Sequence, residues 1–232
     1  MTRAVPFVEF TFNTLYLGFA WVIFVLMLQR YPRLPPSRRR TAFWVVAALF
    51  ALAFGDSFHL LPHNYAILAG RINHPAMGRW LGLGRAISSF TLSFFYLFLL
   101  LYARRKFDLE WDALSVLLVA ACVVRLALLF FPQNHWFTAE PTPWKFYRNI
   151  PFALQGLGVV GLLLAHANGN RRLRIVASAI SASFLFYGAT LVGTLWAPIW
   201  GVMMLPKTLA YVLAVFHLYR LELTLAPTPA WA

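Results

Sequence analysis

Runs of about 20 mostly apolar residues recur along the whole chain, and they limit its fold more than any other feature. One run of this length can cross the hydrocarbon core of a bilayer as a helix. Seven stretches qualify: 7–28, 41–61, 84–103, 112–131, 150–166, 174–196 and 199–220. The runs are continuous and do not alternate, which favours helices over the strands of a barrel. The sequence therefore predicts an all-α, polytopic membrane protein with seven transmembrane helices.

Composition excludes the soluble alternatives. Hydrophobic residues make up 61% of the chain and charged residues 12%, against roughly 45–50% and 25% in soluble domains. A water-soluble globule could not cover that much apolar surface. Cys122 is the only cysteine, so a disulfide scaffold is excluded as well. We expect a single seven-helix transmembrane domain over residues 1–225 and a short C-terminal tail over 226–232.

The basic residues lie mainly between the spans, and their distribution predicts an orientation. Of the 20 lysines and arginines, twelve follow the first, third, fifth and seventh spans, while six lie on the other side. The richer side is expected to be cytoplasmic. The N-terminus is therefore predicted outside and the C-terminus in the cytoplasm. Topology accounts for the net charge of +13 in this way, so the charge predicts no nucleic-acid partner.

Several polar side chains interrupt the apolar spans, although ionisable groups are costly in a bilayer. The predicted topology puts them all in the outer halves of their helices. Arg125 comes about six residues before the end of its span, roughly 9 Å below the surface. This shared depth predicts one outward-facing cavity, which the long connection 132–149 could cover. Its predicted substrate-binding residues are Glu9, Asn13, Arg85, Arg125, Arg148 and Lys207.

The charges in this predicted cavity do not balance. With Lys145 included, five of its side chains are cationic, while the acidic ones are Glu9 and Asp56. A buried excess of cations must find anions. We therefore expect membrane lipids as partners, in particular an anionic amphiphile whose headgroup Arg125, Arg148 and Lys207 hold.

A purely structural arrangement is the alternative explanation for these charges. In it, Asp56 forms an ion pair with Lys207. Glu9 then pairs with Arg125, and the other cations reach the wet interface along their long side chains.

Asp56, His59 and His63 share one face of the second predicted helix, because they are three and four residues apart. A carboxylate that orients an imidazole suits acid–base chemistry. If the protein is an enzyme, Asp56 and His59 are its predicted catalytic residues and the reaction is lipid hydrolysis within the membrane; plain polar packing of these side chains is the alternative. No cofactor is predicted, although the three side chains would suit zinc if a further ligand joined them. Pro62 weakens both arrangements, because proline kinks or breaks a helix.

Two other functions fit the same polar residues. A non-enzymatic carrier or receptor for a lipid or small molecule needs the cations but not His59. An opsin-like Schiff-base protein would use Lys207 in the seventh helix. The third predicted span, however, has no carboxylate to serve as its counterion. The pattern does not predict an oligomeric state.

Four strings of the sequence carry a resemblance: GDSFHLLP at 55–62, FPQN at 131–134, YRNIPF at 147–152 and PKTLAY at 206–211. Together they resemble an uncharacterised group of bacterial seven-helix inner-membrane proteins. The resemblance covers most of the chain and implies a multi-pass position in the bacterial inner membrane, but no activity. Within the first string, Gly55 and Asp56 followed by Leu60-Leu61-Pro62 are similar to a segment of the lysoplasmalogenase family of membrane hydrolases. That family's later Ser-His pair in a helix is not found here.

Overall fold

The computed structural model describes residues 4–71, 74–138 and 142–224, and this part of the chain forms seven long α-helices. The helices are α1 (Ala4–Arg30), α2 (Pro36–Leu68), α3 (Pro75–Phe107), α4 (Ala113–Phe130), α5 (Thr142–Ala165), α6 (Arg171–Gly193) and α7 (Met204–Glu222). Three short 3₁₀ helices lie in the connections: η1 (Tyr31–Arg33), η2 (Pro132–Asn134) and η3 (Pro198–Met203). The prediction of an all-α fold with seven helices is confirmed.

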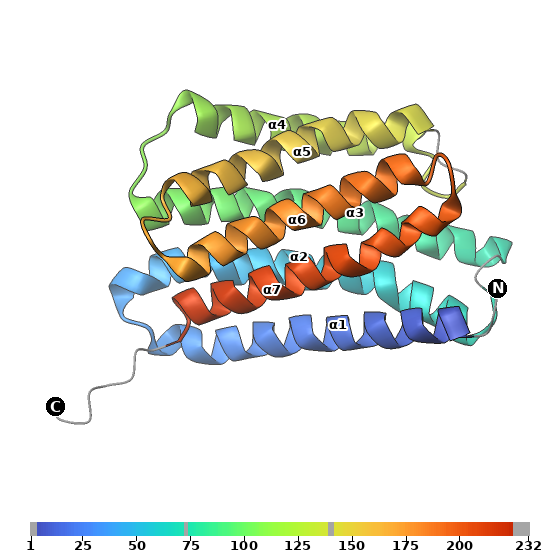
Figure 1. The fold of residues 1–232 in the computed structure, drawn as a ribbon, viewed down its shortest axis with the longest axis horizontal. Helices are drawn as coiled ribbons and strands as arrows, with labels where there is room; N and C mark the ends of the chain where they lie inside the picture. Colours follow the sequence, from blue (N-terminus) through green and yellow to red (C-terminus); the bar gives the residue numbers. More distant parts are fainter. Residues whose placement is uncertain (1–3, 72–73, 139–141, 225–232) are drawn as a thin grey trace.

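The helices run alternately up and down and lie side by side in one bundle (Figure 1). Each helix packs against its neighbours in the chain, and α7 also packs against α1 and α2. One end of the bundle, here called the N-side, holds the start of α1 and the α2–α3, α4–α5 and α6–α7 connections. The opposite end, called the C-side, holds the other three connections and the end of α7.

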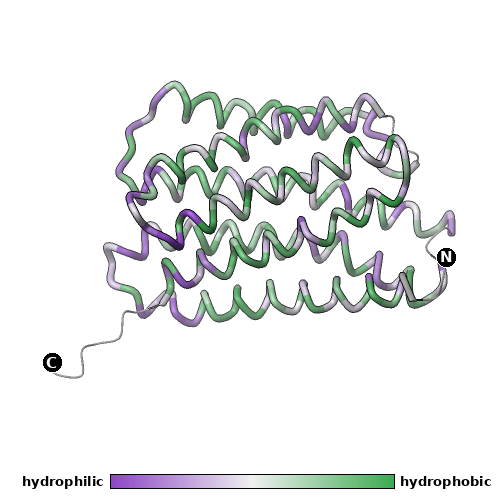
Figure 2. The backbone as a smooth tube through the Cα atoms, in the orientation of Figure 1, coloured by the Kyte–Doolittle hydropathy of each residue, from purple (hydrophilic) through white to green (hydrophobic). Residues whose placement is uncertain are grey.

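All seven helices are long and apolar enough to cross a membrane. Figure 2 shows mostly hydrophobic residues along the middle of the helices, with hydrophilic residues gathered toward the two ends. Large apolar side chains face outward at mid-helix; Leu15 is 68% exposed and Leu185 is 74% exposed. Water disfavours such surface by roughly 25 cal/mol per Å², whereas lipid tails do not. The chain is a multi-pass membrane protein.

Helices α2 and α3 are longer than the predicted spans 41–61 and 84–103. Each has 33 residues, or about 50 Å at 1.5 Å per residue. Pro62 lies inside α2 without ending it. Proline cannot donate to the carbonyl four residues back, which is that of Phe58. This carbonyl faces Gly84 of α3, where a Cβ would lie 2.2 Å from its oxygen. The close passage of α3 therefore covers the gap that Pro62 leaves.

Helix α5 also begins earlier than predicted, at Thr142 instead of 150. Lys145 and Arg148 consequently lie on a helix, and the predicted loop 132–149 is shorter. The predicted separation of the last two spans is confirmed, because α6 ends at Gly193 and η3 begins at Pro198. The predicted domain end at residue 225 and the tail 226–232 lie outside the described residues.

The turn between α3 and α4 is fixed by local capping. Asp108 ends α3 in the left-handed region, with φ of 52°. Asp112 then begins α4, and its carboxylate accepts a hydrogen bond from the Ser115 backbone N–H at 2.8 Å. Hydrogen bonding with Ser115 lowers the pKa of the Asp112 carboxyl.

Candidate functional site

Asp56 lies on α2 where α1 and α3 both approach it. Its Oδ2 accepts a hydrogen bond from the Tyr16 hydroxyl at 2.5 Å, and its Oδ1 accepts one from the Ser88 hydroxyl at 3.2 Å. Gly55 permits this approach, because a Cβ there would lie 1.7 Å from the Thr91 Oγ1. Asp56 therefore ties three helices together, and each of its oxygens has a donor.

The two histidines of the predicted catalytic face are placed differently. His63 Nε2 lies 2.9 Å from Glu9 Oε1, and this pair joins α2 to α1 near the N-side. His59 lies one turn deeper, and its Nδ1 is buried with no hydrogen-bond partner among the described residues. Nowhere in residues 4–71, 74–138 and 142–224 do three His, Cys, Asp or Glu side chains gather as a metal site. Asp56, His59 and His63 thus share a helix face without forming a three-ligand group.

Arg125 is the most unusual side chain in this region. It is 3% exposed, and its guanidinium carbon lies 3.5 Å from the centre of the Phe152 ring on α5. Its Nε and Nη1 are buried and have no hydrogen-bond partner in the part of the chain that the structure describes. A buried charge whose N–H groups lack acceptors costs on the order of several kcal/mol. Two of its donors therefore need an acceptor that the described residues do not supply.

Lys207 and Arg148 are two other cations within electrostatic range of Arg125 or of its neighbours. Arg125 interacts with Arg148, and Lys207 interacts with both Arg125 and Asp56. The structure thus brings together the three cations that the sequence predicted to hold an anion. They come from α4, α5 and α7, which lie apart in the chain.

Aromatic rings, not carboxylates, contact the Lys207 ammonium. Its Nζ lies 5.2 Å from the centre of the Tyr187 ring and 5.6 Å from that of Tyr211. Cations gain modestly from such contacts, about 0.5–2 kcal/mol. A buried ion pair would stabilise the ammonium more than these ring contacts do. The rings therefore position the Lys207 ammonium but do not neutralise its charge.

The two structural ion pairs considered from the sequence do not form. Among the described residues, ion pairs within 4.0 Å join Glu9 to His63 and Lys106 to Glu222. Glu9 is therefore engaged by a histidine on α2 and not by Arg125. Asp56 uses hydroxyl donors in place of Lys207. This alternative explanation therefore does not hold for the described residues, because the carboxylates of Glu9 and Asp56 are engaged by His63 and by hydroxyl donors.

The start of the α4–α5 connection is fixed over the N-side by Asn134 and Trp136. The Asn134 amide is fully buried, donates to three carbonyls at the end of α4, and accepts from Arg148 Nη1 at 3.1 Å. The Trp136 carbonyl accepts from Arg85 Nη2 at 3.1 Å, and its ring lies 4.6 Å from the Arg148 guanidinium carbon. Arg85 and Arg148 therefore also hold this connection in place.

Tyrosine hydroxyls occupy the centre of the site, and the sequence analysis missed them. Tyr96 and Tyr211 place their hydroxyl oxygens 2.6 Å apart. Tyr187 donates to Asn149 Oδ1 at 3.0 Å. The Tyr187 and Tyr211 rings lie beside the Lys207 ammonium, and the Tyr96 ring packs on Phe152, which contacts Arg125. Aromatic residues make up 17% of the chain, so no sequence signal distinguishes these three from packing tyrosines.

Asn13 and Glu9, both predicted to bind substrate, make contacts between α1 and α2. Asn13 Nδ2 donates to Asn64 Oδ1 at 3.1 Å, and Asn64 Nδ2 donates to Thr14 Oγ1 at 3.1 Å. His59 lies against α3 beside Arg85, since a Cβ at Gly84 would lie 2.9 Å from the His59 Cα. The site that emerges is centred on Arg125 and excludes the outermost part of α1.

A second polar cluster, on the C-side, was not predicted. Glu222 is 2% exposed and accepts hydrogen bonds from Lys106 Nζ at 2.7 Å and the Tyr102 hydroxyl at 2.8 Å. Arg38 donates to the Glu222 backbone carbonyl at 2.9 Å. These contacts fasten the end of α7 to α2 and α3. Their donors and acceptors satisfy one another, which marks the cluster as structural.

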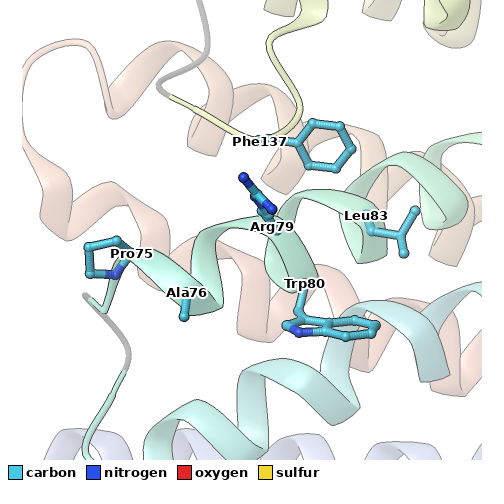
Figure 3. Close-up of a pocket in the computed structure, with 6 residues that line it drawn as sticks. All are labelled: Pro75, Ala76, Arg79, Trp80, Leu83 and Phe137. Carbon is cyan, nitrogen blue, oxygen red and sulfur yellow. The ribbon is translucent and has the colours of Figure 1, made fainter.

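Two pockets open on the N-side. The first has a volume of about 660 Å³ and is lined by Pro75, Ala76, Arg79, Trp80, Leu83 and Phe137 (Figure 3). The second has about 480 Å³ and shares Phe137 with it. Neither pocket is lined by Arg125 or Lys207, so neither corresponds to the predicted cavity.

Comparisons of the chain with protein-family models, with curated proteins and with solved structures found no match.

Proposed function

We propose that this membrane protein binds an anionic amphiphile, with the acidic headgroup held by Arg125 and flanked by Arg148 and Lys207. The observation that carries the proposal is the buried Arg125 guanidinium, whose Nε and Nη1 lack acceptors among the described residues. A phosphate or carboxylate matches the planar donors of arginine and forms charge-assisted hydrogen bonds with them.

The position of Arg125 supports an amphiphile over a free ion. Arg125 lies on α4 about five residues before that helix ends at Phe130, inside a candidate membrane span. Phe152 covers one face of its guanidinium. A ligand whose acidic group reaches this depth gains by keeping an apolar tail in the surrounding bilayer. Under the proposed orientation, with the N-side outside, the amphiphile comes from the outer leaflet.

Lipid hydrolysis is a second candidate function, with Asp56 and His59 as the acid–base pair. The buried, unpartnered Nδ1 of His59 favours it, because a catalytic imidazole needs a free nitrogen. The Asp56 oxygens, however, accept from Tyr16 and Ser88. Binding without chemistry, as in a carrier or receptor, therefore has the stronger support. The opsin-like alternative stays a prediction from Lys207 alone, and colour in the purified protein would reveal it.

The test uses the full chain in mild detergent, with thermal unfolding followed on addition of dodecyl phosphate, dodecanoate or neutral dodecanol. A ligand at 100 times its Kd adds about 2.7 kcal/mol of stability, so the acidic amphiphiles should raise Tm by several degrees. Dodecanol should not. Arg125→Gln and Lys207→Gln should abolish the rise, while Arg105→Gln, an exposed C-side control, should keep it.

Equal stabilisation of wild type and Arg125→Gln would overturn the proposal. The same variants separate binding from catalysis. If His59→Gln binds the amphiphile but no longer cleaves an ester lipid that the wild type cleaves, the protein is a hydrolase. If neither protein releases a product while both bind, the carrier or receptor function stands.

A further inference from the structure

The two N-side pockets both touch Phe137, one on each part of its surroundings, and we call the two together the Phe137 groove. Its shallow part lies against the first turns of α3, with Arg79, Trp80 and Leu83. Figure 3 shows the Arg79 side chain extending toward Phe137. Its deeper part runs between α3 and α4, past Ala86, Phe90 and Phe130. The groove therefore changes from a basic end to an apolar end along the direction of α3.

Gly82 creates this geometry. A Cβ at Gly82 would lie 1.8 Å from the Trp136 carbonyl oxygen, so only glycine lets the α4–α5 connection rest on α3. The connection carries Phe137 outward, where it is 57% exposed, next to Trp80 at 61%. Exposed tryptophans at the end of a span are typical of the headgroup level of a bilayer. The shallow end thus lies where lipid phosphates lie.

We propose that the Phe137 groove binds one phospholipid of the surrounding bilayer. Arg79 contacts its phosphate, and one acyl chain runs along Phe90 and Phe130, whose ring centres are 4.9 Å apart. Charge supports this occupant, because neither pocket has an acidic lining residue and the shallow end contains an arginine. The arrangement of the groove with depth also supports a phospholipid as its occupant. A phospholipid carries its charge at the membrane interface and its apolar chains below, and the groove has its arginine at the shallow end and apolar side chains farther in. This site is separate from the Arg125 site and does not depend on its function.

The experiment is native mass spectrometry of the full chain in mild detergent, titrated with dioleoyl phosphatidylglycerol. We expect one phospholipid to bind before any others. Arg79→Gln should weaken this first binding about tenfold or more, as loss of a charge-assisted hydrogen bond does. Ala86→Phe, which fills the deeper part, should weaken it as well. Arg71→Gln removes an exposed arginine at the same end that lines neither pocket, and should leave it unchanged. Dioleoylglycerol, which lacks the phosphate, should not compete.

The outcomes separate this site from the proposed function. Arg125→Gln should retain the first phospholipid while losing dodecyl phosphate. If Arg125→Gln releases the phospholipid and Arg79→Gln keeps it, the groove proposal fails and the lipid belongs at Arg125. Unchanged binding in Arg79→Gln also overturns it. A dimer mass that dissociates in Ala86→Phe would assign the groove to contact between two copies of the chain, and would overturn it equally.

Discussion

The guanidinium of Arg125 rests on the ring of Phe152, with 3.5 Å between its central carbon and the ring centre. Phe152 is itself held by Tyr96 and Phe184, at 5.3 and 5.2 Å between ring centres. One arginine from α4 is thus positioned by an aromatic cluster from α3, α5 and α6. The cluster supplies packing and orientation but no acceptor for the two buried nitrogens, Nε and Nη1. We therefore expect Arg125 to lower the stability of the ligand-free protein while it contributes to binding of the anion.

Replacement of Arg125 by methionine should stabilise the ligand-free protein. Removing a buried, incompletely paired charge is worth about 1–4 kcal/mol in comparable cases, and each kcal/mol shifts Tm by roughly 2–4 °C at this chain length. Arg104 is the matched control, because it is also buried but donates to the Ser115 hydroxyl at 2.8 Å. Arg104→Met should lower Tm. Thermal unfolding of both variants in one detergent decides this; equal losses would contradict the expectation.

Tyr16→Phe should destabilise the protein, because Asp56 would lose its shorter hydrogen bond. Hydrogen bonds to a charged group contribute about 1.5–3 kcal/mol, and we expect a loss in this range. Ser88→Ala should cost less, since its oxygen is 3.2 Å from Asp56. Tyr65→Phe, at an exposed position on α2, is the control. Urea unfolding measures all three, and a Tyr16→Phe result no larger than that of Tyr65→Phe would refute the role of Tyr16.

Two glycines should respond in opposite ways to alanine. Gly82→Ala places a Cβ 1.8 Å from the Trp136 carbonyl oxygen, whereas a Cβ at Gly161 meets nothing within 4 Å. Overpacking against backbone costs about 1–3 kcal/mol, and alanine in a free helical position gains up to about 1 kcal/mol. The unfolding midpoint should therefore fall in Gly82→Ala and rise in Gly161→Ala. Similar shifts in both variants would mean that the connection does not rest on Gly82.

Glu222→Gln should destabilise the protein by weakening the attachment of α7 to α3 on the C-side. The amide can still accept from Tyr102, but the ion pair of Glu222 with Lys106 is lost. We expect a loss of about 1–3 kcal/mol, because the pair is charge-assisted and its acid is buried. Lys106→Met combined with Glu222→Gln should cost little more than Glu222→Gln alone. A double-mutant cycle gives the coupling, and strictly additive effects would argue against the pair.

The Asp112 cap gives a pH-dependent prediction. Its pKa is lowered in the folded protein by hydrogen bonding with Ser115. The charged cap therefore stabilises the fold above the ordinary pKa of an aspartate, and this contribution is lost as the pH falls through the lowered value. Asp112→Ala should lower Tm at pH 7, and the difference should shrink in acid. A difference that is the same at pH 7 and pH 3 would show that the charge has no part in it.

The candidate site contains some residues that the sequence could identify and others that it could not. Arg125, Arg148 and Lys207 could be selected because charges in apolar runs are rare and their depths agreed. Tyr16 and Tyr187 could not, because tyrosine is common in membrane helices and its partners are remote in the chain. The assignment of Glu9 to Arg125 failed for a related reason: only the packing of α1 against α2 gives Glu9 its neighbour, His63.

The sequence by itself determined the class of fold and the number of helices, and it singled out the ionisable residues inside the spans. It could do so because a bilayer requires about 20 apolar residues per span and makes every ionisable residue conspicuous. Lateral arrangement was decided by the tertiary structure alone. Gly55, Gly82 and Gly84 set how closely α3 approaches α2 and the α4–α5 connection, through contacts between backbones and hydroxyls distant in the chain. Packing of this kind depends on the shapes of two surfaces at once, and hydropathy along one chain does not record it.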